Sequence, residues 1–236
     1  MDTLISLRGI TKRYKQGQRV VEVLYNLNLS IARGEFVALM GPSGSGKSTL
    51  LNIMGALDKV DRGTVTIAGE HLEGYSARRL SRWRARHVGL VFQSYHLLPT
   101  LSVERNVALP LLLTRLSARQ VRVRVATALD LLGIAECARR LPTELSGGQQ
   151  QRAAIARAIV ADPTLLICDE PTGDLDRANA DKVLKILREL NQKQHKTIVM
   201  ATHDQRIVDA MRRRVMELDH GSLVRDQVRG VYGVGS

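Results

Sequence analysis

The sequence predicts an α/β fold with a mostly parallel β-sheet, on the basis of three observations. Short, continuous apolar runs recur along the chain, and such runs are typical of strands that are buried on both faces. Helical patterns separate the runs, which is the alternation found where helices cover a parallel sheet. Glycine-rich or polar segments follow the runs directly, at the strand ends where ligands bind in this fold class. The runs predicted as buried strands are residues 36–40, 88–92, 165–168 and 197–201.

The remaining elements follow from weaker patterns. Residues 4–7, 20–24 and 27–31 partly alternate apolar and polar side chains, as half-exposed strands do, and residues 64–68 form a further predicted strand. Helices are predicted where apolar residues recur at helical spacing, and glycine or proline ends them. The predicted helices are residues 47–57, 117–132, 149–161 and 177–194. Residues 215–224 are predicted to form a hairpin, and residues 225–236 a loose tail.

Composition limits the cellular setting. Hydrophobic residues make up 44% of the 236 residues, which is enough for a sizeable core, and no apolar run reaches the 18 residues of a membrane span. The first residues lack the basic, apolar and small-residue order of a signal peptide, so we expect a cytoplasmic protein. Cys137 and Cys168 are the only cysteines and are expected to be buried, inert thiols.

The chain is strongly basic. It has 35 Lys and Arg against 23 Asp and Glu, a net charge of +12, with basic clusters at residues 78–87 and 212–214. This balance favours an anionic partner such as a nucleotide, a nucleic acid or a lipid surface, although such clusters are usually solvated faces. Aromatic residues make up only 3%, which disfavours nucleic-acid binding by base stacking.

The most specific local pattern is GPSGSGKS at residues 41–48, which fits G-x-x-x-x-G-K-[ST] at every fixed position. Glycines let successive N–H groups approach phosphate oxygens, and the N-terminus of the following helix adds its positive dipole end. Lys47 is predicted to reach the β- and γ-phosphates, and the Ser48 hydroxyl to bind Mg²⁺. The predicted ATP-binding residues of this loop are Gly41, Pro42, Ser43, Gly44, Ser45, Gly46, Lys47, Ser48 and Thr49.

An acidic pair at the end of a buried run supplies the complementary groups. Asp169 is predicted to hold the Mg²⁺ ion through water, and Glu170 to polarise the attacking water as general base. Together, the glycine loop and the acidic pair predict a P-loop nucleoside triphosphatase, without specifying which kind.

The stretch TELSGGQQQR at residues 143–152 indicates which kind of P-loop nucleoside triphosphatase this is. It resembles the signature sequence of the ATP-binding cassette (ABC) family, L-S-G-G-Q, without a mismatch. Other segments resemble further family motifs in the family's order. Gln93 resembles the Q-loop glutamine that binds Mg²⁺, His203 the switch histidine that senses the γ-phosphate, and Tyr14 the aromatic residue that stacks on adenine. The signature residues are Leu145, Ser146, Gly147, Gly148 and Gln149, and the D-loop residues are Asp174, Leu175 and Asp176. Taken singly, His203, Tyr14 and Gln93 are also compatible with ordinary structural positions. Arg152 and Arg157 are each expected to form a surface ion pair rather than to assist the phosphates.

The resemblance implies a single ABC ATPase domain over residues 1–236, with a RecA-like P-loop NTPase core, an N-terminal antiparallel β subdomain and a helical subdomain that carries the signature. On this division the core and β subdomain take residues 1–92 and 150–224, and the helical subdomain takes residues 94–149. It also implies a head-to-tail homodimer in which each ATP lies between one subunit's glycine loop and the signature residues of the second copy. ATP and Mg²⁺ are the implied cofactors.

Residues 91–113 and 170–176 resemble a subgroup of ATPases that serve lipoprotein release, macrolide export and cell division. This resemblance implies a separate integral-membrane permease with an extracytoplasmic domain, and a peripheral position on the cytoplasmic face of the inner membrane. Leu97, Leu98, Leu101 and Val103 are then expected to contact the permease, or to complete the helical core. Two segments depart from the subgroup: Asp174 stands where an Asn is usual, and residues 177–180 replace a stretch that contains Thr-Gly.

Two other functions remain open from the sequence. The net charge is compatible with a nucleic-acid-associated ABC ATPase, although no nucleic acid is expected because the chain has neither long insertions nor a second cassette. A regulatory ATPase that gates a periplasmic enzyme through a membrane partner would use the same residues as a transport ATPase.

Overall fold

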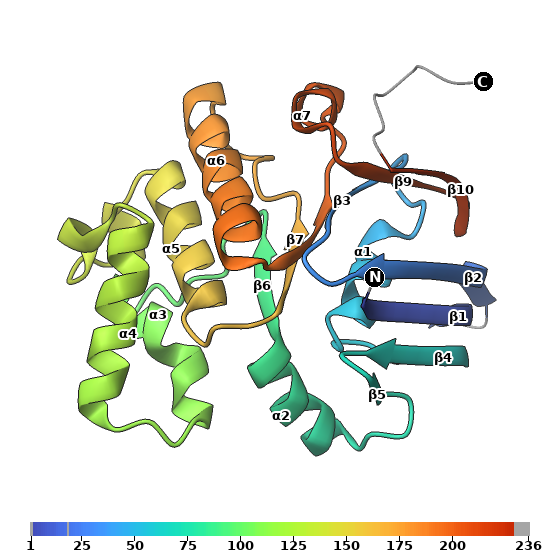
Figure 1. The fold of residues 1–236 in the computed structure, drawn as a ribbon, viewed down its shortest axis with the longest axis horizontal. Coiled ribbons are helices and arrows are strands. Elements are labelled where there is room, and N and C mark those ends of the chain that lie inside the picture. The colour runs from blue at the N-terminus through green and yellow to red at the C-terminus, as the bar shows by residue number, and fades with distance from the viewer. Residues whose placement is uncertain (1, 18, 229–236) are drawn as a thin grey trace. The chain divides into compact units, whose positions relative to one another are not determined.

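A computed structural model of the chain describes residues 2–17 and 19–228. It divides into two compact units, which are described separately below. The first unit combines the residues up to Ser81 with those from Thr197 onward, and the second unit is Arg82–Lys196. Helix α2 (Ala77–His87) contains the boundary between them (Figure 1).

The first unit contains an antiparallel sheet with the strand order β2-β1-β4-β5. Its strands are β1 (Thr3–Gln16), β2 (Arg19–Ala32), β4 (Arg62–Ile67) and β5 (Glu70–His71). The sequence predicted two separate strands within 20–31, whereas β2 is continuous. The interruption is a local irregularity at Asn26, which has a left-handed backbone with φ 44°, and shifts of the β1–β2 register accommodate it.

The same unit contains a second group of strands centred on β3 (Phe36–Met40). β3 pairs in parallel with β8 (Thr197–Ala201) and β9 (Arg214–Asp219), and β10 (Ser222–Gln227) pairs antiparallel with β9. Every residue of β3 and β8 is buried, which confirms the prediction from their apolar runs.

Two helices accompany this sheet. Helix α1 (Lys47–Met54) follows β3 and contacts β8. The short helix α7 (Gln205–Met211) was not predicted, because seven residues give little periodicity. Asp204 caps its N-terminus, and Val208 packs in a buried cluster with Ala38, Met40 and Val215.

The predicted start of the tail at residue 225 is wrong, because β10 extends to Gln227. Arg214 on β9 donates to both carboxylate oxygens of Asp226 at 2.7 Å, and it also pairs with Glu35. These ion pairs hold the strand end, and the Arg214 side chain is only 14% exposed, so it is not part of a solvated face. Residues 229–236 of the predicted tail lie outside the described residues.

The second unit pairs β6 (Val88–Phe92) in parallel with β7 (Leu165–Asp169) and surrounds helix α5 (Gly147–Ile159) with helices. α5 contacts β6 and three helices, α3 (Val103–Ala108), α4 (Ala118–Leu131) and α6 (Arg177–Gln194). The 3₁₀ turns η1 (Leu109–Leu113), η2 (Ala135–Cys137) and η3 (Pro142–Glu144) complete this unit. Helices α4 and α6 match their predicted positions to within a residue.

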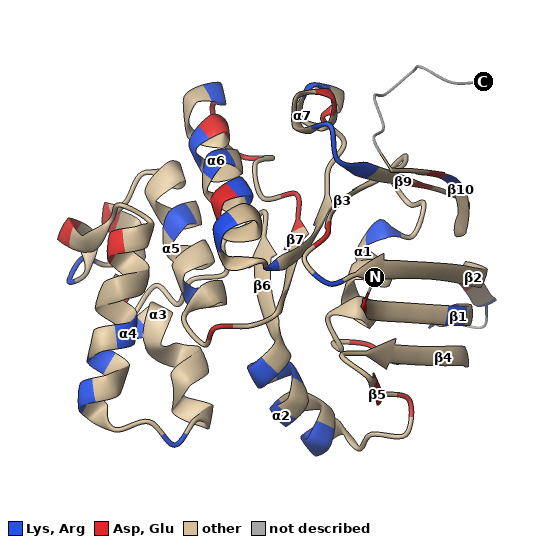
Figure 2. Cartoon of the chain, viewed as in Figure 1, with Lys and Arg blue, Asp and Glu red and all other residues tan. Residues whose placement is uncertain are grey.

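The basic cluster at residues 78–87 forms the amphipathic helix α2. Leu80 and Trp83 are buried, and the Arg79 guanidinium lies 3.7 Å from the ring centroid of Tyr75. Figure 2 shows that α2 carries basic residues and no acidic ones, and that basic residues also lie on the first turns of α4.

The two cysteines agree with the compositional analysis. Cys137 and Cys168 are buried free thiols, and burial raises the pKa of Cys168 to about 12. Among the described residues, no helix combines the length and apolar character that crossing a membrane requires.

Candidate nucleotide-binding site

In the first unit, the glycine-rich loop joins β3 to α1. Gly46 is the N-cap of α1 with φ 102°, and no side chain caps this helix. The N–H groups of the first turn are therefore not used by a side-chain cap, and such groups bind phosphate at helix N-termini. Lys47 Nζ donates to the carbonyl oxygens of Gly41 at 2.8 Å and Pro42 at 2.9 Å, so the ammonium group lies over the loop.

Two further groups of this unit belong to the same region. Leu39 of β3 lies opposite Ala201 of β8, and Thr202 N donates to Leu39 O at 3.1 Å. The glycine loop and His203 therefore leave the same edge of the sheet. Ser45 Oγ is buried in this loop without a hydrogen-bond partner among the described residues, which is the kind of polar atom that a bound oxyanion can satisfy.

The turn between β9 and β10 braces the glycine loop, a feature that the sequence did not predict. Gly221 N donates to Ser45 O at 3.1 Å, and Gly221 O accepts from Tyr25 N at 3.0 Å. Gly221 has φ +77°, and a Cβ atom there would lie 2.3 Å from Val23 O. Only glycine fits this close approach between the turn, β2 and the loop.

We expect Gly221→Ala to lower the free energy of unfolding by about 1–3 kcal/mol, because it adds both a clash and an unfavourable φ. Nucleotide binding should weaken as well, since the turn holds Ser45. The matched control is Gly69→Ala, where φ is +78° but a Cβ atom would meet nothing within 4 Å. Urea denaturation of both variants separates the cost of the clash from the cost of the unfavourable φ. Equal losses in the free energy of unfolding for the two variants would contradict the bracing role of Gly221.

Tyr14 is held by a group of polar residues. Its hydroxyl donates to Asp58 Oδ2 at 2.6 Å. Lys12 Nζ donates to Asp58 Oδ1 at 2.7 Å and lies 4.9 Å from the Tyr14 ring centroid. Burial, and then the hydrogen bond to Asp58, raise the pKa of Tyr14, so the ring stays a neutral phenol at neutral pH.

Asp58 provides a pH-dependent contribution to stability. Burial acts to raise the pKa of Asp58, but the hydrogen bonds from Lys12 and Tyr14 outweigh it and hold that pKa below its usual value. A carboxyl group whose pKa is lowered by folding stabilises the fold above its unfolded pKa of about 3.9, and this contribution is lost as the pH falls through the folded pKa.

We therefore expect Asp58→Asn to lower the free energy of unfolding most at neutral pH, with a difference from the wild type that narrows as the pH falls below about 4. Urea denaturation of both proteins between neutral pH and pH 3 measures this difference. A difference that stays constant over that range would contradict the assigned role of the Asp58 charge.

In the second unit, the ends of β6 and β7 bring the predicted Q-loop and acidic residues to one edge. Phe92 lies opposite Asp169 in the parallel register, so Gln93 and Glu170 follow at neighbouring strand ends. Glu170 has a left-handed backbone with φ 47°, an unfavourable conformation for a residue with a side chain. Such conformations cluster at functional sites, where the surrounding structure enforces them.

Helix α5 holds the two loops that follow β6 and β7, one after Gln93 and one after Glu170. Arg157 donates to the carbonyl oxygens of Tyr95 and His96, both of which have positive φ values, so it secures the loop after Gln93. The expectation of a surface ion pair at Arg157 is therefore wrong, because its partners are backbone carbonyls. Gln151 is fully buried, and its Nε2 donates to Pro171 O at 2.5 Å, next to Glu170.

The signature residues form the N-terminus of α5. Ser146 Oγ accepts from Gln149 N at 3.3 Å, and Ser146 N donates to Gln149 Oε1 at 3.0 Å, which is a capping box. The helix begins at Gly147, two residues before the predicted start, because this box places the cap at Ser146. Gln150 Nε2 in turn donates to Leu145 O at 3.2 Å. Each glutamine of the run 149–151 thus has its own backbone partner.

Helix α6 contacts the signature through a residue that the sequence analysis did not select. Asn179 Oδ1 would lie only 2.4 Å from a Cβ atom at Gly148, and Asn179 also bonds to its helix cap, Asp176. Asn179 belongs to the segment 177–180, which was noted only as a departure from related sequences. No local pattern predicts the contacts of Gly221 with Ser45, of Arg157 with Tyr95 or of Asn179 with Gly148, because these residues are distant in the chain.

The predicted site residues are thus divided between the units. Tyr14, residues 41–49 and His203 lie in the first unit, and Gln93, Asp169, Glu170, the signature and the D-loop lie in the second. A glycine loop between a buried strand and a helix, on an α/β sheet with parallel strand pairs, defines the class of P-loop nucleotide-binding proteins.

Comparison with known proteins identifies the family. A family model described as "ABC transporter" matches residues 24–173, and the chain belongs to this family. It is 42% identical over 226 residues to the macrolide export ATP-binding/permease protein MacB of Shigella flexneri, covering 96% of this chain and 35% of that protein. It is 41% identical to the uncharacterized ABC transporter ATP-binding protein YknY of Bacillus subtilis, covering 94% of this chain and 95% of that one.

A solved structure also resembles this fold. The dimeric, post-hydrolysis structure of the ATP-binding cassette MJ0796 with ADP and Pi superposes with a TM-score of 0.89 at 38% identity, covering 96% of this chain and 99% of that one. The organism of MJ0796 is Methanocaldococcus jannaschii. The chain is therefore an ATP-binding cassette with the fold of the P-loop NTPases, and it is an ATPase. It spans about a third of the length of its MacB relative.

Proposed function

We propose that this cassette drives a separate integral-membrane permease by binding and hydrolysing ATP. The observation that carries the proposal is that 96% of the chain matches 35% of a MacB protein, whose name joins an ATP-binding part to a permease. YknY matches over nearly its full length, so a cassette of this size also occurs as a chain of its own. Export of macrolides, lipoproteins or other amphiphiles is the cargo class that these relationships favour.

The first unit holds the triphosphate in this proposal. The uncapped start of α1 and Lys47 bind the phosphate groups, Tyr14 stacks on the adenine ring, and His203 senses the γ-phosphate. The orphaned Ser45 hydroxyl and the uncapped helix supply the hydrogen-bonding capacity that a triphosphate requires. Hydrolysis would remove the γ-phosphate from the groups proposed to bind it, such as Lys47 and His203. Loss of such a contact is one way in which hydrolysis switches a conformation.

Mg²⁺ is the proposed metal cofactor, with Ser48, Gln93 and Asp169 as the residues that hold it. A hydroxyl, an amide and a carboxylate fit the preference of this hard cation for oxygen ligands. The metal would neutralise phosphate charge. Glu170 is the proposed general base, placed by the turn in which Gly173 N donates to Glu170 O at 3.1 Å.

The signature residues are proposed to act on ATP bound by a second copy of the chain. In the capping box, the side chains of Ser146 and Gln149 bond to each other's backbone N–H groups, so this cap does not use the N–H groups of Gly147 and Gly148. These two N–H groups lie at the N-terminus of α5, where the helix dipole favours an anion. The dimeric state described for MJ0796 supports two copies as the active assembly. ATP binding would then close the dimer, and hydrolysis would let it open.

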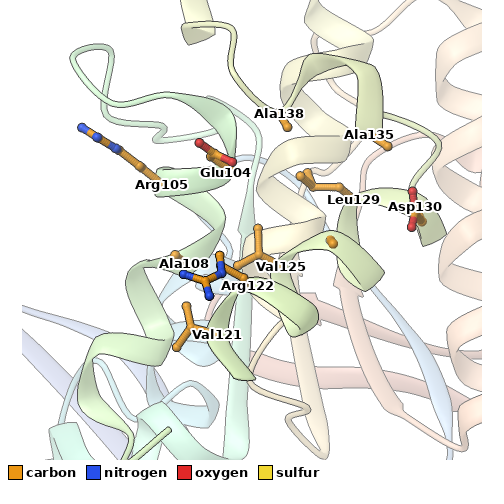
Figure 3. A pocket seen from close by; sticks show the side chains of 11 residues that line it. Glu104, Arg105, Ala108, Val121, Arg122, Val125, Leu129, Asp130, Ala135 and Ala138 are labelled. Carbon is orange, nitrogen blue, oxygen red and sulfur yellow. The ribbon is translucent and has the colours of Figure 1, made fainter. Parts of the chain in front are cut away.

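The second unit offers a surface for the permease. Val103 is fully buried, so it completes the helical core, whereas Leu98, Leu112 and Leu113 are 46%, 74% and 70% exposed. Asn106 holds the loop of Leu98 by bonding its N–H and its carbonyl oxygen. A cavity of about 470 Å³ lies between α3 and α4, with an apolar floor at Val125 and Leu129 (Figure 3). Exposed leucines on the same unit fit the face of an apolar partner helix, and the cavity adds apolar surface at Val125 and Leu129.

Affinity purification from membranes tests the proposal. The wild-type chain should co-purify with one integral-membrane protein, and Leu112→Ser/Leu113→Ser should lose it. Val20→Ser is the matched control, because Val20 is 58% exposed but lies on β2 of the first unit. Recovery of nucleic acid in place of a membrane protein, with strong salt dependence, would instead favour the nucleic-acid function.

A further inference from the structure

The D-loop contacts the Q-loop glutamine directly. Gln93 Nε2 donates to Asp174 Oδ1 at 2.7 Å. Gly173 lets the loop approach this amide, since a Cβ atom there would lie 3.0 Å from both Cδ and Nε2 of Gln93. Asp174 therefore faces the segment that carries Gln93.

The hydrogen bond to Asp174 determines which end of the Gln93 side-chain amide faces the D-loop. A glutamine amide has a donor end, Nε2, and an acceptor end, Oε1, and the two can exchange places by rotation about one bond. An ionised carboxylate accepts hydrogen bonds but does not donate them, so Asp174 can engage only the Nε2 end. An Asn at position 174 could engage either end, because it carries its own donor and its own acceptor.

We infer that Asp174 is a positioning residue that turns the Gln93 amide so that Oε1 points away from the D-loop, available to the Mg²⁺ ion of bound ATP. The inference rests on the proposed metal role of Gln93. Only the oxygen end of the amide can bind this cation. By holding Nε2, Asp174 removes the orientation that cannot bind metal and reduces the rotamer entropy lost on binding.

Electrostatic attraction by Asp174 is the competing explanation, because a carboxylate near a cation site favours cation binding without orienting anything. The two explanations differ in their dependence on Gln93. Orientation requires the amide, so removing Asp174 should have no further effect once Gln93 is an alanine. Electrostatic attraction would persist in that background. A double-mutant cycle therefore separates them.

The experiment uses the full chain and a non-hydrolysable β,γ-imido analogue of ATP, with Mg²⁺ titrated at fixed protein and analogue concentrations. We expect Asp174→Ala to raise the half-saturating Mg²⁺ concentration about threefold to tenfold, the range for losing one hydrogen bond. Asp174→Asn should raise it about twofold, because its amide permits both orientations of Gln93. The control Asp181→Ala removes an exposed carboxylate from α6 of the same unit and should leave the value unchanged.

A second readout needs no metal and no nucleotide. The side-chain NH₂ signal of Gln93, assigned by its loss in Gln93→Ala, should show slowed hydrogen exchange in the wild type and fast exchange in Asp174→Ala. Unchanged exchange in Asp174→Ala would overturn the inference.

The binding outcomes separate this inference from the proposed function. If wild-type binding of the analogue depends on Mg²⁺ but Asp174→Ala leaves that dependence unchanged, the orientation by Asp174 is overturned and the metal site stands. An effect of Asp174→Ala that persists in the Gln93→Ala background overturns orientation in favour of electrostatic attraction. If wild-type binding has no Mg²⁺ dependence, the proposed metal role of Gln93 fails, and the inference fails with it.

Discussion

Replacing Glu170 by Gln should reduce ATP hydrolysis about 10²–10⁴-fold, the range for losing a general base, while ATP still binds. The substitution keeps the size and the hydrogen-bonding reach of the side chain but removes its capacity to accept a proton at neutral pH. The backbone around it should persist, because Gln151 holds the neighbouring Pro171 carbonyl through a buried hydrogen bond. Phosphate release and equilibrium ATP binding, measured on the same preparation, test both halves of the expectation.

Glu189→Gln is the matched control for this substitution. Glu189 lies on α6, where it pairs with Lys193 across one helical turn, so neutralising it removes the same charge from the second unit at an exposed position. Its turnover should equal that of the wild type. Undiminished hydrolysis by Glu170→Gln would reject Glu170 as the base, and a parallel loss of ATP binding would indicate a structural role instead.

Mixing two inactive variants should restore activity if each ATP lies between two copies of the chain. Lys47→Ala disables the glycine loop. Ser146→Asp keeps a residue that caps helices well but places a negative charge where the γ-phosphate is expected. In a mixed dimer, one composite site combines the intact Lys47 of one copy with the intact Ser146 of the other. With random pairing and independent sites, about a quarter of wild-type hydrolysis should return, because half of the dimers carry one intact site.

The control for this experiment mixes Lys47→Ala with the double variant Lys47→Ala/Ser146→Asp. Every copy then lacks Lys47, so no mixture contains an intact site and no hydrolysis should return. Rescue in this control, or a first mixture no more active than its parents, would contradict the shared site.

The sequence predicts the buried strands β3, β6 and β8 more accurately than the more exposed strands β2 and β10. Strands β3, β6 and β8 begin and end where their apolar runs do, because burial on both faces leaves no room for polar residues. The continuous β2 and the extension of β10 to Gln227 were missed, since a backbone irregularity at Asn26 and ion pairs of Arg214 decide them. The ion pairs of Arg214 join residues that are distant in the chain.

In the candidate site, too, local features can be predicted from the sequence, whereas contacts between distant residues cannot. The glycine loop and the capping box of Ser146 and Gln149 are local, so their residue order predicts where each lies in the fold. The brace from Gly221 to Ser45 and the bond between Gln93 and Asp174 are not local. Local sequence patterns therefore predict candidate ligand-binding residues, whereas contacts between distant residues, such as those of Gly221 and Asp174, emerge only from the folded chain.

The association of Glu170→Gln protein with ATP tests the central claim most directly, because the proposed mechanism requires one nucleotide to join two copies. Sedimentation should give the mass of one chain without nucleotide and the mass of two chains with ATP and Mg²⁺, with two ATP molecules bound per dimer. A protein that binds saturating ATP and still sediments as a single chain would contradict the account.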